Sequence, residues 1–113
     1  MAGSREDAQL LVQLAQWGAT MGLDEAVSAI LDDAFDPASA TTQDMPVRRV
    51  LNFGETIGTL VKNGLLDREL ALDWLWVAGL WQRVAPAVQA AREKYGELRL
   101  GENFEALAAA QSG

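Results

Sequence analysis

Residues 47–64, VRRVLNFGETIGTLVKNG, decide the expected fold. Their apolar and glycine positions recur every three to four residues, which is the spacing of one helix face. These positions are Val47, Val50, Leu51, Gly54, Ile57, Gly58 and Val61, and Phe53 and Leu60 widen the face. Asn63-Gly64 is typical of a helix end, because glycine adopts the left-handed conformation without strain. The stretch therefore predicts a helix that buries one broad side.

Two helices are expected ahead of this stretch. Ser4 precedes acidic residues at a typical N-cap position, and apolar residues then recur at helical spacing over about residues 5–21. Gly22 can stop that helix, and a second is expected over about residues 23–35. The small and polar residues 36–45 predict a loop. The sequence thus predicts an acidic helical hairpin over about residues 5–35.

Two more features are expected after the stretch. Asp67 is a typical cap for a fourth helix, from Arg68 onward. Pro86 has no N–H to donate to Gln82, so the helical pattern is expected either to break near Val84 or to kink there.

The remaining segment, from Glu102 or Asn103 to Ala110, predicts a short last helix, and no run alternates as a half-buried strand does. The whole chain, residues 1–113, is therefore expected to be one all-α domain: a compact bundle of five to six helices with its helical core over residues 46–110.

The composition argues against several functions. The chain has no cysteine and no histidine, which removes thiol nucleophiles, imidazole catalysis and the usual zinc sites. Its net charge of −7 repels phosphate backbones. We expect no enzymatic activity, no cofactor, no metal and no nucleic-acid partner. The acidic N-terminus does not resemble a secretory signal, and the longest uncharged apolar run, Trp74 to Trp81, is far shorter than a membrane span. A cytoplasmic protein without membrane contact is expected.

All of the net charge lies in residues 1–46, which hold eight acidic residues and one basic residue. A solvated acidic surface and a docking surface for a basic partner both remain open. Asp32, Asp33 and Asp36 lie near the predicted end of the second helix, where negative charge opposes the helix dipole. Their spacing does not match a calcium loop, so no metal is expected, but basic groups such as Arg48 and Arg49 could lie nearby.

Two glycine pairs lie at a spacing of four, Gly18 with Gly22 and Gly54 with Gly58. Close packing of a second helix or of an aromatic ring is the expected reason, and a ligand pocket floored by glycine backbone is the alternative. Glu55 borders the apolar face of its helix, and Arg92 borders a later apolar stripe. A partly buried Glu55–Arg92 ion pair is expected, with a catalytic carboxylate at Glu55 as its rival.

Four short motifs lie between residues 46 and 108. They are Arg49-Val-Leu-Asn-Phe-Gly-Glu55, Gly64-Leu-Leu-Asp67, Trp81 with Val84-Ala-Pro86 and Arg92, and Asn103-Phe-Glu105-x-Leu107. In this pattern the chain resembles a group of uncharacterised bacterial helical domains of unknown function. The resemblance implies a compact helical fold with no assigned activity, cofactor or catalytic residue. It also implies a membrane-spanning segment ahead of the domain in many relatives, where this chain has its acidic helices.

The tryptophan-rich segment supplies the functional hypothesis. If one helix runs through it, Leu72, Trp76 and Leu80 form a second apolar face opposite the core-facing stripe. Such a helix is either central in its bundle or lies at an interface. We therefore expect a non-enzymatic interaction domain, as a homodimer or bound to another protein. The alternative is a small-molecule binding protein or carboxylate-dependent enzyme, with a pocket between the third and fourth helices lined by Trp74, Trp81 and Glu55.

Overall fold

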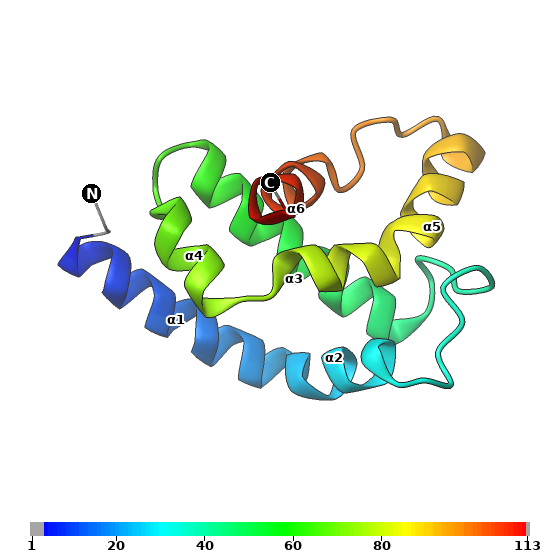
Figure 1. Cartoon of the computed structure of the whole chain (residues 1–113), viewed down its shortest axis with the longest axis horizontal. Helices are drawn as coiled ribbons and strands as arrows, with labels where there is room; N and C mark the ends of the chain where they lie inside the picture. The colour runs from blue at the N-terminus through cyan, green and yellow to red at the C-terminus, as the bar shows by residue number, and fades with distance from the viewer. Residues whose placement is uncertain (1–3, 113) are drawn as a thin grey trace.

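The computed structural model describes residues 4–112, and this part of the chain contains six helices and no strand (Figure 1). The helices are α1 (Arg5–Met21), α2 (Leu23–Leu31), α3 (Met45–Lys62), α4 (Arg68–Trp74), α5 (Val77–Tyr95) and α6 (Glu102–Ser112). The predicted all-α class is confirmed. None of these six helices combines the length and the hydropathy that crossing a bilayer requires.

Helix α3 lies at the centre of the bundle, against α2, α5 and α6. Its predicted apolar face is buried, with Phe53 and Ile57 almost without exposed surface. Phe104 of α6 and Ile30 of α2 meet this face and are equally buried. The helix ends at Lys62, and Gly64 takes a φ of 72° there, so the predicted Asn63-Gly64 end is confirmed.

Helix α6 crosses α3 over its two glycines. A Cβ atom at Gly54 would lie 2.5 Å from the ring of Phe104, and one at Gly58 would overlap the backbone carbonyl of Asn103. The expectation that these glycines serve close packing is confirmed. The first pair differs: Gly18 packs against Leu23 and the Phe53 ring, whereas Gly22 is left-handed and ends α1.

The N-terminal helices do not form a hairpin. Gly22 alone separates α1 from α2, and in Figure 1 the two run on in the same general direction along one side of the bundle. A helical hairpin needs a connection of several residues, which a single glycine does not provide. Helix α2 also ends at Leu31, four residues earlier than predicted.

The fourth predicted helix is interrupted at Leu75 and Trp76, where Leu75 is extended (φ −119°, ψ 139°). The predicted cap at Asp67 is confirmed, because its side chain accepts a hydrogen bond from the N–H of Leu70. Pro86 does not break the chain: α5 continues through it, and in Figure 1 the second half of α5 takes a different direction from the first. Of the two alternatives at this proline, the kinked helix is the one observed.

Candidate functional site

The break between α4 and α5 is held by one distant side chain. The Gln111 side chain accepts a hydrogen bond from the N–H of Ala78 at 2.7 Å. Its amide nitrogen donates to the carbonyls of Leu72 at 3.1 Å and Leu75 at 2.9 Å. Helix ends leave such groups without partners inside the helix. Gln111 therefore provides hydrogen-bond partners for backbone carbonyls at the end of α4 and for a backbone N–H at the start of α5.

Trp76 lies within this break and is 63% exposed. Its ring lies over Gly79, where any Cβ atom would overlap the indole. Glycine inside a helix lowers stability by roughly 1 kcal/mol relative to alanine. Gly79 thus provides the space that holds an exposed aromatic ring against the surface of α5.

A hollow of about 600 Å³ lies beside Trp76, between α5 and α6. Besides Trp76 it is lined by Ala78, Gly79, Trp81, Gln82, Ala85, Pro86, Gln89, Glu105, Ala108 and Ala109. The only ionisable member is Glu105, which forms an ion pair with Arg92 at 2.9 Å. We call Trp76 and this lining the Trp76 face. On its other side Trp76 borders a second hollow, of about 560 Å³, against α1 and α2.

The break overturns the helical geometry behind the predicted interface. Leu72 and Leu80 belong to different helices, so the three residues form no continuous face, although Leu80 and Trp76 both line the second hollow. Leu80 is buried in the core, and Leu72 is half-buried against it. Of the three predicted interface residues, only Trp76 is exposed to solvent.

The predicted Glu55–Arg92 ion pair is wrong, although both residues are partly buried as expected. Glu55 accepts hydrogen bonds from the N–H groups of Asn103 and Phe104, each at 3.0 Å, and from the Asn103 side chain at 2.9 Å. Arg92 instead pairs with Glu105. The free amides at the start of α6 attract the carboxylate, so Glu55 caps that helix from α3.

The acidic cluster after α2 is also arranged differently from the prediction. Because α2 ends at Leu31, Asp32, Asp33 and Asp36 share no helix face; Asp32 and Asp36 accept bonds from nearby backbone N–H groups in turns. The basic partner of this helix end is Arg83, which donates to the carbonyls of Ile30, Asp32 and Phe35. Within residues 4–112 no three carboxylates come close enough together to hold a metal ion.

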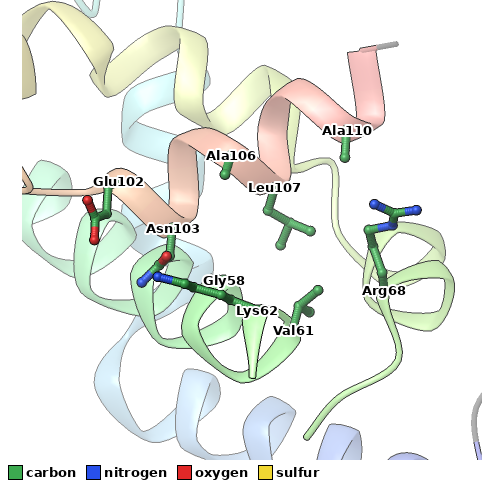
Figure 2. A pocket seen from close by; sticks show the side chains of 9 residues that line it. All are labelled: Gly58, Val61, Lys62, Arg68, Glu102, Asn103, Ala106, Leu107 and Ala110. Atoms are coloured by element: carbon green, nitrogen blue, oxygen red, sulfur yellow. The ribbon is translucent and has the colours of Figure 1, made fainter. Parts of the chain in front are cut away.

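A third hollow, of about 740 Å³, lies between the end of α3, the first residue of α4 and α6 (Figure 2). It is lined by Gly58, Val61, Lys62, Arg68, Glu102, Asn103, Ala106, Leu107 and Ala110. None of the predicted pocket residues is among them. Trp74 packs edge-on against Phe53, Trp81 packs edge-on against Phe104, and Glu55 caps α6.

The sequence analysis missed Gln111, Arg83, Lys62 and Arg68. Nothing local marks Gln111 or Arg83, because the groups that they bind lie more than 30 residues away. Lys62 and Arg68 flank the predicted Asn63-Gly64 turn on either side. That flanking position is a signal that could have suggested a shared site.

These features define a small all-α domain in which α6 crosses the central helix α3 and is capped by Glu55. An exposed tryptophan and two hollows lie beside α6. The chain belongs to a family described as a domain of unknown function, DUF4760, whose model matches residues 4–111. The expected resemblance to a helical domain of unknown function is thereby confirmed, but it was expected over residues 46–108 only, and the match also includes the N-terminal helices. No curated protein and no solved structure is detectably similar to the chain.

Proposed function

We propose that the chain is a non-enzymatic interaction domain that pairs with a second copy through the Trp76 face. The observation that carries the proposal is the exposed indole of Trp76 beside a hollow that is almost free of charge. Large exposed aromatic side chains are enriched at the energetic centres of protein interfaces.

The composition of the Trp76 face favours a second copy as the occupant. A two-fold contact uses the same patch on both copies, so the patch has to complement itself. The Trp76 face places an exposed aromatic ring directly beside a hollow. Its only ionisable side chain, Glu105, is already paired with Arg92, so two copies of this acidic chain can meet there without opposing unpaired charges.

Sedimentation equilibrium over a concentration series tests the proposal. The wild type should approach twice the 12.2 kDa chain mass at high concentration. Trp76→Ser should remain a monomer, and it should stay folded because serine suits the N-cap position that Trp76 occupies before α5.

A matched pair of charge variants locates the contact. Ala109→Glu places a carboxylate in the hollow and should also give a monomer. Ala90→Glu adds the same charge at an exposed position of α5 outside the Trp76 face, and it should dimerise like the wild type. A wild type that stays monomeric at every concentration, or equal weakening by both variants, contradicts the proposal.

The proposal includes a cytoplasmic location, with which a chain without cysteine is compatible because it needs no oxidising compartment to form disulfides. Expression with a fluorescent tag, followed by fractionation, tests the location.

The rival function as a carboxylate-dependent enzyme is less well supported. The Glu55 carboxylate already accepts hydrogen bonds from the start of α6.

A further inference from the structure

The hollow between α3 and α6 has an apolar floor and a cationic rim. In Figure 2 Leu107 points into it from α6, between Ala106 and Ala110, and Val61 lies opposite on α3. Its volume of about 740 Å³ lies within the usual range for small-molecule sites, which is roughly 300–1,000 Å³. The space therefore suits the apolar body of a small ligand.

The rim carries two cations without a direct partner in the described part of the chain, although Lys62 contributes at longer range to the lowered pKa of Glu102. Lys62 comes from the end of α3 and Arg68 from the start of α4 (Figure 2). Neither side chain forms an ion pair or a hydrogen bond with any residue between 4 and 112. The chain has only nine basic residues and a net charge of −7. Two such cations beside one apolar hollow therefore give this site a local positive charge, which favours an anionic ligand.

The other polar groups of this hollow already have partners. The carboxylate of Glu102 binds Arg99 at 2.8 Å, and this bond is the main reason why the pKa of Glu102 is lowered. The Asn103 side chain donates to Glu55 and to Thr59. Within residues 4–112, the rim donors without a partner are therefore those of Lys62 and Arg68.

We infer that this hollow binds a small amphipathic carboxylate, with its apolar body on the alanines and Leu107. Lys62 and Arg68 flank the hollow from opposite ends (Figure 2), and their long side chains turn towards the head group when it binds. A polyanion such as RNA is disfavoured by the net charge of the chain. The site shares no lining residue with the Trp76 face, so it is independent of the proposed self-association.

Calorimetric titration with sodium decanoate, kept below its micelle concentration, tests the inference. Decanoate should bind one-to-one with saturable heat. Butyrate has the same head without the long body, and decyltrimethylammonium has the body with the opposite charge; neither should saturate. Lys62→Gln and Arg68→Gln should each weaken decanoate binding about tenfold, whereas Lys94→Gln, at an exposed lysine of α5, should not change it.

Methyl NMR locates the bound probe. The alanine signals of Ala106 and Ala110 should shift on titration, and that of Ala109 should not. The Trp76→Ser variant should bind with unchanged affinity, which separates this site from the proposed dimer. Absence of saturable heat, equal binding of the cationic amphiphile, or shifts confined to Ala109 would overturn the inference.

Discussion

The crossing of α3 and α6 and the break between α4 and α5 both contain helix ends whose backbone groups need hydrogen-bond partners. The two regions supply these partners in different ways. At the crossing, Gly54 makes room for the Phe104 ring and Gly58 for the backbone of Asn103, and Glu55 accepts hydrogen bonds from the first N–H groups of α6. At the break, one side chain, Gln111, satisfies two helix ends, and the nearby Trp76 remains exposed. The crossing has no large side chain left in solvent, whereas the break has one.

This difference indicates that the residues of the crossing serve stability, whereas Trp76 serves a role at the surface. The glycines of α3 and the cap at Glu55 are explained by packing inside one chain. The position of Trp76 is not, because a smaller polar residue would cap α5 better and would expose less apolar surface. An exposed aromatic that its own fold does not require favours a role outside the monomer.

Gly58→Ala should have the largest effect on the crossing. At an unobstructed helix position this change raises stability by up to about 1 kcal/mol, but here the new methyl overlaps the carbonyl of Asn103. We expect a loss of about 3 kcal/mol in the free energy of unfolding, measured with urea. Gly64→Ala meets no neighbour and should lose about 1–2 kcal/mol through its left-handed backbone alone. A stabilised Gly58→Ala variant would show that α6 does not lie against α3.

Gln111→Glu should have the next largest effect, at the break. A carboxylate can still accept from the N–H of Ala78, but it cannot donate to the carbonyls of Leu72 and Leu75. The expected loss is about 2 kcal/mol in the free energy of unfolding. Gln9→Glu makes the same change at an exposed position of α1 and should be nearly neutral. Equal stability of the two variants would contradict the claim that the hydrogen bonds of Gln111 stabilise the break.

The smallest effect concerns Asp7, which joins α1 to the start of α4. The pKa of Asp7 is lowered from 3.8, first by hydrogen bonds from Ser4 and then by one from the N–H of Asp67. A carboxyl whose pKa is lower in the folded state stabilises the fold above its unfolded pKa, and this contribution disappears as the pH falls through the folded value. Urea midpoints of the wild type and Asp7→Asn should therefore differ at pH 7 and converge below pH 3.8. A difference that persists unchanged at low pH would contradict this assignment.

The features predicted correctly from the sequence are local ones. The apolar face of α3, its Asn63-Gly64 end and the cap at Asp67 depend on residues within a few positions of each other. The break at Leu75 and Trp76 was not predicted, because the side chain that bonds to it, Gln111, lies 36 residues beyond Leu75 in the sequence.

The same reasoning explains the wrong partner of Glu55. Its border position correctly predicted partial burial, but helical periodicity does not reveal which distant group lies opposite. The backbone N–H groups of Asn103 and Phe104 carry no sequence signal of their own, whereas Arg92 was marked by its place beside an apolar stripe. For Trp76, the pattern predicted an exposed surface for the wrong reason, since the continuous helix behind that prediction does not exist.

The exposure of the Trp76 indole at different protein concentrations tests the central claim most directly. The chain has four tryptophans, and a soluble paramagnetic agent broadens the NMR signals of those indole N–H groups that it can reach. As the concentration rises, the broadening of Trp76 should decrease, while that of Trp17, which is 38% exposed on α1 outside the Trp76 face, should stay constant. Broadening of Trp76 that does not change with concentration would contradict self-association through this face.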